Sequence, residues 1–287
     1  MIRIAVIANC QARPVATLVR HLAPQAEITG IAVVHLATPK DETSLAEACA
    51  AADLVFAQLV ADNYPVPFVR TAALKAAHPG KVVAWPNLFF RGQCPDLHYA
   101  TGEGRRRLNG PLGDYHSRTV LDGWLGGRPT AATLARLEEG DLAAPPGAAE
   151  DSLAQLRQRE AAADVAVSDL IAEDWTRRRL FFTFNHPRRV LLEAVTRRLL
   201  AAAGIAATGA IPPRYGEPLG RVVPPMTAGM RTALGLDFGD EGEAIRGIAW
   251  PSEPTTRHLE YTLPDLVDAL YHAYDSQADV ARAARLS

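Results

Sequence analysis

The chain opens with Ile2-Arg3-Ile4-Ala5-Val6-Ile7-Ala8 and runs directly into Asn9-Cys10-Gln11. The first stretch is a short apolar run with β-branched residues, which predicts a buried strand of a parallel sheet. From Gln11 to Leu22 the apolar residues follow helical spacing, and Pro14 is tolerated in a first helical turn. The sequence therefore predicts a strand that ends in a polar turn and is followed at once by a helix.

Cys10 lies at the junction of this strand and this helix. The free N–H groups and partial positive charge of a helix N-terminus stabilise a thiolate relative to a thiol. Cys10 is therefore a candidate nucleophile at neutral pH. The alternative is a small apolar residue that fills the strand end, because free cysteines are often buried. The position of Cys10 alone does not choose between the two.

The first ninety residues alternate between strand and helix patterns. Apolar runs predict strands over residues 2–8, 27–35, 53–58 and 81–85, and helical spacing predicts helices over residues 11–22, 44–51 and 67–77. This alternation predicts an α/β fold with a parallel sheet flanked by helices. Ligands bind such sheets beyond the carboxyl ends of the strands, where Cys10, Gln58 and Pro86-Asn87 all fall.

The rest of the chain is less regular. Residues 86–128 are rich in aromatics, glycine and proline, and long loops of this kind usually carry function. A strand over 180–184 ends at Asn185-His186-Pro187 and leads into a helix over 187–203, which repeats the opening arrangement. We expect an α/β core over 1–205 with a functional loop at 86–128. Residues 206–287 are expected to form a Pro-punctuated, mainly helical extension packed on this core.

Composition excludes several classes of protein. A formal net charge of -2 with 22% charged residues leaves no basic footprint for nucleic acid. The three cysteines have neither pair spacing nor a neighbouring histidine cluster, which argues against a disulfide framework or a metal site. No apolar run approaches the roughly 20 residues of a membrane span, and no signal peptide opens the chain, so a cytoplasmic protein is expected.

His186 is the best candidate for a base that serves Cys10. It ends a strand, and it would face the same crevice as Cys10 if both strands belong to one sheet. Asn185 could orient the imidazole or donate to an oxyanion. A simple N-cap before a Pro-initiated helix explains Asn185 but not His186. His116 is the second candidate, in the loop Gly113-Asp114-Tyr115-His116-Ser117, for which a solvated turn is the alternative.

Two arginine clusters could hold phosphate groups, because guanidinium binds phosphate with two parallel hydrogen bonds. They are Arg105–Arg107 and the pair Arg188 and Arg189, which is predicted to lie in a first helical turn that itself favours an anion. Ordinary solvated charge is the alternative. The turn after the first strand lacks every glycine of the dinucleotide motif, which argues against a nicotinamide dehydrogenase.

Several motifs occur in a characteristic order. They are Asn9-Cys10-Gln11, Asp53-Leu54-Val55 with Gln58, Pro86-Asn87 with Phe89-Phe90, Pro95-Asp96-Leu97, Gly113-Asp114-Tyr115-His116-Ser117, and Leu180-Phe181 with Thr183 and Asn185-His186-Pro187. In this order the chain resembles the WcbI family of polysaccharide-biosynthesis proteins, over roughly residues 2–203. The chain departs from that family at Ala8, where the family usually has glycine.

The resemblance implies a coenzyme A-binding protein that O-acetylates a sugar of a capsular or surface polysaccharide, with a sheet like that of SGNH-type hydrolases and Cys in place of their Ser. It implies that Cys10, Gln11, Asn185 and His186 form the catalytic centre. The residues expected to contact coenzyme A or acetyl-CoA are Arg188, Arg189, His116, Arg105, Arg106 and Gln58. The expected partners are a sugar or polysaccharide precursor and other proteins of polysaccharide biosynthesis.

Two forms of the acetyl transfer are open. In the covalent form the Cys10 thiolate takes the acetyl group, the oxyanion is held by N–H groups near Gln11 together with Asn185 or Gln58, and His186 then deprotonates the sugar. In the direct form His186 is the base and Cys10 only shapes the pocket. An esterase or thioesterase, or a non-catalytic subunit that binds coenzyme A or glycan, are the alternative functions.

Overall fold

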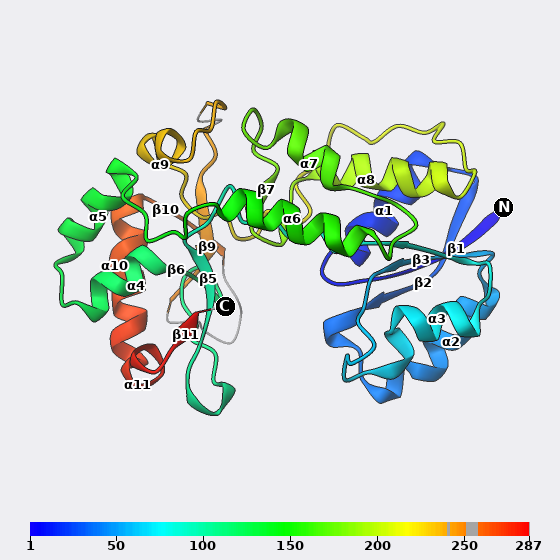
Figure 1. Ribbon diagram of the computed structural model, residues 1–287, viewed down its shortest axis with the longest axis horizontal. Coiled ribbons are helices and arrows are strands. Elements are labelled where there is room, and N and C mark those ends of the chain that lie inside the picture. The colour runs from blue at the N-terminus through cyan, green and yellow to red at the C-terminus, as the bar shows by residue number, and fades with distance from the viewer. Residues whose placement is uncertain (240–241, 251–257, 287) are drawn as a thin grey trace. The chain divides into compact units, whose positions relative to one another are not determined.

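The computed structural model describes residues 1–239, 242–250 and 258–286 (Figure 1). The chain forms two compact units, and it passes between them several times. Unit 1 comprises Met1–Phe89, Leu153–Glu173 and Asn185–Leu219, and unit 2 comprises Phe90–Ser152, Asp174–Phe184 and the described residues from Gly220 onward. These units do not follow the predicted boundary between residues 205 and 206.

Unit 1 contains a four-stranded parallel sheet. Its strand order is β2-β1-β3-β4, with bounds β1 Ile2–Ala8, β2 Ala26–Val33, β3 Leu54–Gln58 and β4 Val82–Trp85. The predicted parallel sheet is therefore confirmed, and the predicted strand over 2–8 has the predicted ends. β1 lies between β2 and β3, and its residues from Ile4 to Ala8 are buried completely.

Helices cover both faces of this sheet, as Figure 1 shows. One face is covered by α1 (Ala12–Leu22) and α8 (Arg189–Ala202). The other face is covered by α2 (Glu42–Ala51) and α3 (Thr71–Ala77). α6 (Ala148–Glu160), α7 (Ser168–Asp174) and the short 3-10 turns η1 (Val34–Leu36), η2 (Pro39–Asp41) and η3 (Pro67–Val69) connect these elements. The predicted helix over 67–77 is thus a 3-10 turn followed by α3.

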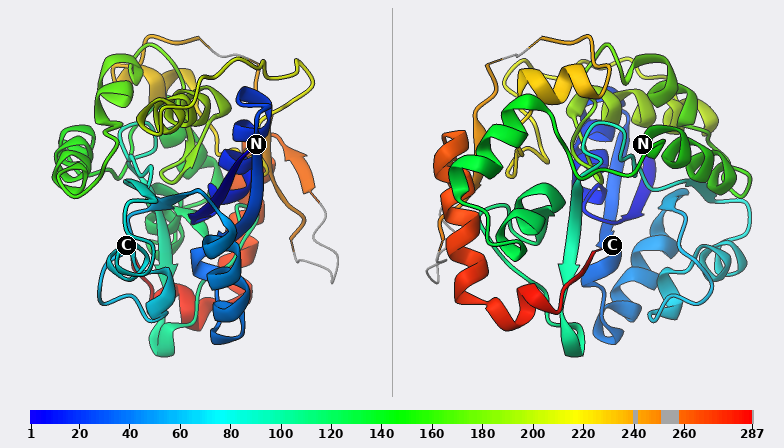
Figure 2. Two further views of the ribbon diagram at one scale, coloured as in Figure 1. Left: turned by 90° about the vertical axis from the view of Figure 1, so that its right-hand side faces the viewer. Right: turned by 60° about the vertical axis from the view of Figure 1, so that its left-hand side comes forward.

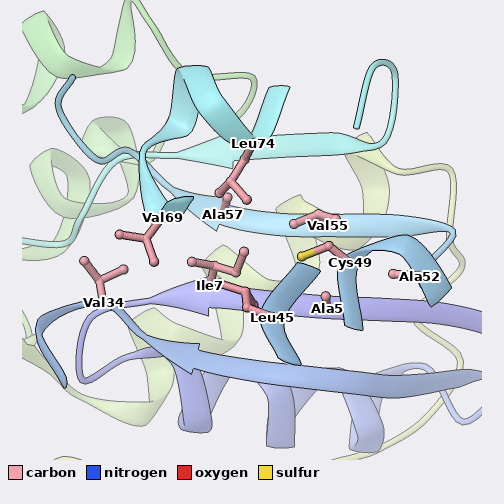
Figure 3. Packing of buried hydrophobic residues seen from close by; sticks show 10 residues of the cluster. All are labelled: Ala5, Ile7, Val34, Leu45, Cys49, Ala52, Val55, Ala57, Val69 and Leu74. Carbon is pink, nitrogen blue, oxygen red and sulfur yellow. The ribbon is translucent and has the colours of Figure 1, made fainter. Parts of the chain in front are cut away.

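A cluster of buried apolar side chains packs under α2 and α3 (Figure 3). Ile7 from β1 meets Leu45 and Cys49 from α2 and Leu74 from α3 in one cluster. Burial of each large aliphatic side chain contributes about 1.5–3 kcal/mol. Cys49 is completely buried in this cluster, so its thiol acts as a small apolar group.

Unit 2 is built on antiparallel pairs. β5 (Leu97–Thr101) pairs with β6 (Tyr115–Ser117) on one side and β11 (Arg285–Leu286) on the other, while β9 (Ile245–Ile248) pairs with β10 (His258–Tyr261). The helices are α4 (Arg118–Leu125), α5 (Thr130–Glu139), α9 (Ala228–Ala233), α10 (Leu263–Ser276) and α11 (Ala278–Arg282). Figure 2 shows the same elements from two further directions.

Two sequence predictions are corrected by unit 2. Residues 86–128 contain β5, β6, α4 and the 3-10 turn η4 (Glu103–Arg105), so they are largely ordered structure with buried side chains and not one long loop. The strand predicted over 180–184 is β7 (Phe181–Thr183), and β7 is not among the strands of the parallel sheet. Within the described ranges no helix is long and apolar enough to cross a membrane, and no cluster of histidine, cysteine and carboxylate side chains could hold a metal ion.

Candidate active site

The turn after β1 places Cys10 one residue before the N-cap of α1. Gln11 is the N-cap, and the backbone N–H of Ala12 donates to the Asn9 carbonyl oxygen at 3.0 Å. Asn9 and Cys10 are both partly exposed, whereas Gln11 is completely buried. The turn thus places a partly exposed cysteine next to a buried amide side chain.

Three amide side chains fix this turn. The Asn9 backbone N–H donates to Gln58 Oε1 at 2.9 Å, and Gln58 Nε2 donates to Gln11 Oε1 at 2.6 Å. The Gln11 backbone N–H donates to Asn9 Oδ1 at 3.0 Å. Gln58 is 2% exposed and Gln11 is completely buried, so neither amide can bind water. These bonds take the place of the hydrogen bonds to water that burial removes. The predicted meeting of Gln58 with the Cys10 turn is therefore confirmed.

The Gln11 side chain also binds two distant segments of unit 1. Its Nε2 donates to the carbonyl oxygens of Leu88 and Asn185, each at 3.2 Å. Leu88 directly follows the Pro86-Asn87 segment that was predicted at this edge of the sheet. Gln11 is accordingly a positioning residue, because both of its amide hydrogens and its oxygen are engaged within the protein.

The pKa of Cys10 shifts in the direction opposite to the one expected at a helix N-terminus. Burial raises the pKa of the Cys10 thiol to about 11, and its own backbone N–H lowers the pKa only partly in return. The thiol donates to Asn9 Oδ1 at 3.7 Å. Because α1 begins at Ala12, Cys10 precedes the turn whose N–H groups carry the helix dipole. Desolvation therefore outweighs the electrostatic effect that the sequence suggested.

The Gln11 backbone N–H is not directed at a ligand. It donates to Asn9 Oδ1, so the expected oxyanion donor near Gln11 is already used within the turn. Gln58, which was expected to hold the oxyanion or the cofactor, is nearly completely buried beneath the same turn. Both groups shape the turn that presents Cys10.

Asn185 and His186 are partly exposed in unit 1, and the Asn185 carbonyl oxygen accepts from Gln11. His186 and Pro187 form the short strand β8, and α8 begins only at Arg189 with Arg188 as its N-cap. The interpretation of Asn185 as a helix N-cap is therefore wrong. The Gln11–Asn185 hydrogen bond joins the segment that carries His186 to the turn that carries Cys10.

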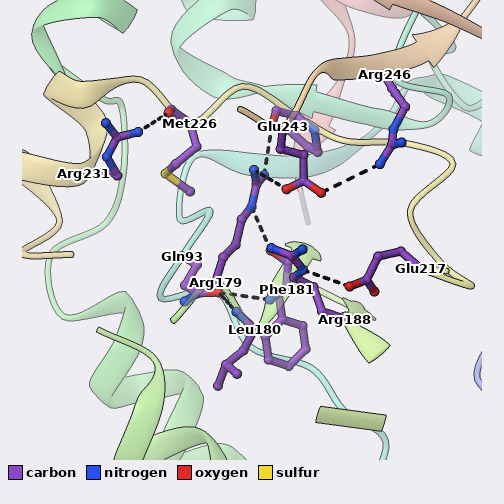
Figure 4. A network of polar contacts seen from close by, with 11 residues as sticks. Gln93, Arg179, Leu180, Phe181, Arg188, Glu217, Met226, Arg231, Glu243 and Arg246 are labelled. Carbon is purple, nitrogen blue, oxygen red and sulfur yellow. Dashed lines mark hydrogen bonds and ion pairs between the residues drawn. The ribbon is translucent and has the colours of Figure 1, made fainter. Parts of the chain in front are cut away.

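Glu217 binds both Arg188 and Arg189, and Figure 4 shows its contact with Arg188. Arg188 Nε lies 3.3 Å from Glu217 Oε1, and the Arg189 backbone N–H donates to Glu217 Oε2 at 2.7 Å. Arg189 Nη1 also donates to the Tyr215 carbonyl oxygen at 2.7 Å. An internal carboxylate thus lies where the sequence suggested a phosphate at the N-terminus of α8.

His116 is a buried structural histidine. Its side chain is 0% exposed, and its Nδ1 and Nε2 lie 3.2 Å from the Tyr274 hydroxyl and 3.1 Å from the Leu108 carbonyl oxygen. Burial lowers its pKa to about 4. The neutral ring donates from Nε2 to Leu108 and accepts at Nδ1 from Tyr274. The expected contact of His116 with a cofactor is not supported, because the side chain has no exposed surface.

The first arginine cluster is exposed and paired. Arg106 Nη1 lies 2.7 Å from Asp279 Oδ2, and Arg107 pairs with Asp114 while its guanidinium lies over the Tyr99 ring. The side chain of Arg105 lies outside the described part of the chain. The described arginines of this cluster therefore bind carboxylates of the protein and do not converge on a common site.

Arg91 is a cation that the sequence reasoning did not single out. Its Nη2 donates to the Leu97 carbonyl oxygen at 3.2 Å and lies 3.1 Å from His98 Nε2, and its guanidinium lies 5.8 Å from the centre of the Phe184 ring. Among the described residues no carboxylate forms an ion pair with it. Only its place three residues after Leu88, in a motif rich in aromatics, could have suggested it.

Comparisons with known proteins identify the family and a similar fold. The family model described as "Polysaccharide biosynthesis enzyme WcbI" matches residues 3–208. A solved structure of WcbI, described as a novel polysaccharide biosynthesis enzyme, has a TM-score of 0.77 at 19% identity and covers 98% of this chain and 92% of that chain. Its description names native protein without a disulfide bond between coenzyme A and a cysteine. No curated protein matches. The chain thus belongs to the WcbI family of polysaccharide biosynthesis enzymes.

Proposed function

We propose that this protein is a coenzyme A-dependent O-acetyltransferase that acts on a sugar hydroxyl in capsular or surface polysaccharide biosynthesis. The observation that supports this proposal best is the Gln11–Asn185 hydrogen bond, which ties the partly exposed Cys10 turn to the partly exposed Asn185-His186 segment. Thiol, amide and imidazole groups on adjoining segments are the groups that acyl transfer uses. The family membership supplies the polysaccharide context.

The roles follow from these side chains. Acetyl-CoA supplies an acetyl group activated as a thioester. His186 is the base that takes the proton from the sugar hydroxyl, and Asn185 orients the imidazole or donates to the developing oxyanion. Cys10 is a neutral thiol, since burial raises its pKa to about 11. This favours the direct form of transfer, in which Cys10 shapes the pocket and the sugar oxygen would attack the acetyl carbon. The C–S bond of the thioester would then break, and coenzyme A would leave as a thiol with the proton that His186 took from the sugar.

The cofactor needs cations for its phosphate groups, and the described arginines differ in this respect. Arg188 and Arg189 would first have to leave Glu217, and Arg106 would have to leave Asp279. Arg91 requires no such exchange, because its hydrogen-bond partners are a carbonyl oxygen and a neutral histidine. Burial lowers the pKa of His98 to about 4, so that ring is neutral and adds no second positive charge beside Arg91. Arg91 is therefore our first choice for a phosphate contact.

The test has two stages. Calorimetric titration with coenzyme A, with NAD and a nucleotide sugar as controls, should give selective binding of coenzyme A. Acetyl transfer to candidate sugars is then measured for the wild type and for Cys10→Ala, Cys10→Ser and His186→Gln. We expect His186→Gln to lose at least about 100-fold in rate, in line with general-base catalysis, while both Cys10 variants keep near-normal turnover.

Other outcomes select other functions. Loss of turnover in Cys10→Ser would favour the covalent form, and consumption of acetyl-CoA without any sugar would favour a thioesterase. Acetylation of the capsule in cells that is unchanged in all three variants, with no acetyl transfer by the purified protein, would favour a non-catalytic binding subunit. Absence of coenzyme A binding under every condition would reject the transferase.

A further inference from the structure

Unit 2 contains a polar cavity whose lining includes none of the residues assigned to the acetyl transfer. Its volume is about 260 Å³. The charged groups in its wall are Arg179, Arg231 and Glu243, and the apolar part of the wall is formed by Pro225, Met226, Phe238, Ile245 and Leu263. A cavity with a few polar groups on one side and an apolar surface on the other is the usual form of a small-molecule site.

Arg179 lines this cavity, and its side chain is held in place by several contacts. Its side chain is 8% exposed, and its Nη1 lies 3.2 Å from Glu243 Oε2. Its Nη2 donates to the Pro224 carbonyl oxygen at 3.0 Å, and its guanidinium lies 5.9 Å from the centre of the Phe182 ring. A guanidinium held on several sides keeps its direction when a ligand enters, so little conformational entropy is lost on binding.

Glu243 does not make the cavity acidic. Its carboxylate contacts Arg179 on one oxygen, and Arg246 Nη2 lies 3.7 Å from the other (Figure 4). Two guanidinium groups therefore compensate one carboxylate. Glu260 lies opposite Arg246 in the β9–β10 ladder and is exposed. Among the described residues of the wall there are two guanidinium groups and one carboxylate, a net charge of +1 from 2 − 1.

Arg231 supplies that charge. It lies on α9, is half-buried, and donates from Nη1 to the Met226 carbonyl oxygen at 2.9 Å (Figure 4). In the part of the chain that the structure describes, no carboxylate pairs with it. Its remaining N–H groups match the two-oxygen geometry of phosphate or carboxylate.

We propose that this cavity binds the oxyanionic group, phosphate or carboxylate, of a monosaccharide. Arg231 binds the oxyanion, the fixed guanidinium of Arg179 adds positive charge to the wall, and Pro225, Met226 and Phe238 pack against the C–H face of the ring. The volume lies just below the range of about 300–1,000 Å³ found for drug-sized ligands, which suits one sugar ring and not the whole of coenzyme A. The identification of the ring as a sugar rests on the proposed function. The acceptor of the proposed acetyl transfer would then be a sugar that carries a negative charge.

The experiment titrates the full-length protein with glucose 1-phosphate, glucuronate, glucose and inorganic phosphate, by calorimetry at fixed ionic strength. We expect glucose 1-phosphate or glucuronate to bind at least 10-fold more tightly than glucose, and the stronger of the two identifies the oxyanion. Arg231→Ala should weaken that ligand at least 10-fold, with partial recovery in Arg231→Lys. The matched control is Arg221→Ala, because Arg221 is an exposed arginine of unit 2 that contacts His258 and does not line the cavity.

The proposal is overturned if neutral glucose binds as well as the charged sugars, if no sugar binds, or if Arg221→Ala weakens binding as much as Arg231→Ala. Tighter binding of inorganic phosphate than of either charged sugar would reject the sugar ring. Coenzyme A affinity is measured in the same variants and should not change in Arg231→Ala. If the charged sugar binds but coenzyme A does not, the proposed function is rejected, whereas the assignment of this cavity as a binding site for a charged sugar still holds.

Discussion

Gln11 Nε2 donates to the carbonyl oxygen of Asn185 at 3.2 Å, across 174 residues of sequence. The bond connects the residue after Cys10 with the residue before His186. Gln11 is completely buried, and its amide oxygen accepts from Gln58 at 2.6 Å. One amide group therefore determines how the two halves of the candidate active site meet within unit 1.

Loss of this amide group should destabilise the protein. Gln11→Ala removes the partner of Gln58 Nε2 and leaves the Leu88 and Asn185 carbonyl oxygens without it, so we expect the free energy of unfolding to fall by about 2–4 kcal/mol. Urea unfolding measures it. Gln25→Ala is the matched control, because Gln25 Nε2 donates to the Ala206 carbonyl oxygen at 2.7 Å from the surface, and its loss should cost less than about 1 kcal/mol. Equal losses would refute the role assigned to Gln11.

The raised pKa of Cys10 can be measured by alkylation. With a pKa of about 11, the thiolate fraction at pH 7.5 is on the order of 100-fold below that of a free cysteine with a pKa of about 8.5. Iodoacetamide should therefore modify Cys10 slowly at pH 7.5 and faster at each higher pH up to about 11. Mass spectrometry of the wild type and Cys10→Ala isolates this residue from the buried Cys49 and Cys94. Rapid modification with a plateau near pH 7 would show that the thiolate forms in solution.

Substitution of Arg91 should weaken the binding of coenzyme A, whereas substitution of Arg188 should not. Arg91→Ala should weaken coenzyme A about 10-fold, because a guanidinium–phosphate contact is worth roughly 1.5–3 kcal/mol. Arg188→Ala should leave this affinity within about 2-fold, since Arg188 already pairs with Glu217 at 3.3 Å. Calorimetry on both variants decides between them. A 10-fold loss in Arg188→Ala with intact Arg91→Ala would instead return the phosphate site to the N-terminus of α8.

His116 should make the protein sensitive to acid. Its folded pKa of about 4 lies below the ordinary value of 6.5, so the unfolded chain binds the proton first as the pH falls. The stability is therefore fully present above about pH 6.5 and decreases toward pH 4, by up to roughly 3 kcal/mol for this group.

The control is His116→Gln, in which the pH slope between 6.5 and 4.5 should be smaller than in the wild type. The pKa of His98 is lowered in the same way, so part of the slope should remain. An unchanged slope in His116→Gln would mean that His116 is not buried as a neutral ring.

Local sequence patterns were sufficient to predict much of the fold of unit 1. The apolar run from Ile2 to Ala8 and the helical spacing after Gln11 identify β1 and α1, because both periodicities are local. The same reasoning placed Gln58 at the edge of the sheet that holds Cys10, since carboxyl ends of parallel strands share one edge. It failed at residues 86–128, where glycine and proline conceal the strands β5 and β6.

What the sequence determined by itself is the parallel sheet of unit 1, its polar strand ends and the family, because neighbouring residues and ordered motifs express them. Only the tertiary structure decided which of those polar groups are available to a ligand. Glu217 holds Arg188 from 29 residues away, and Tyr274 reaches His116 across 158. Burial by distant segments also sets the pKa of Cys10, which its place beside a helix had suggested should be low. Desolvation and hydrogen-bond pairing depend on residues far apart in the chain, and no local pattern reports them.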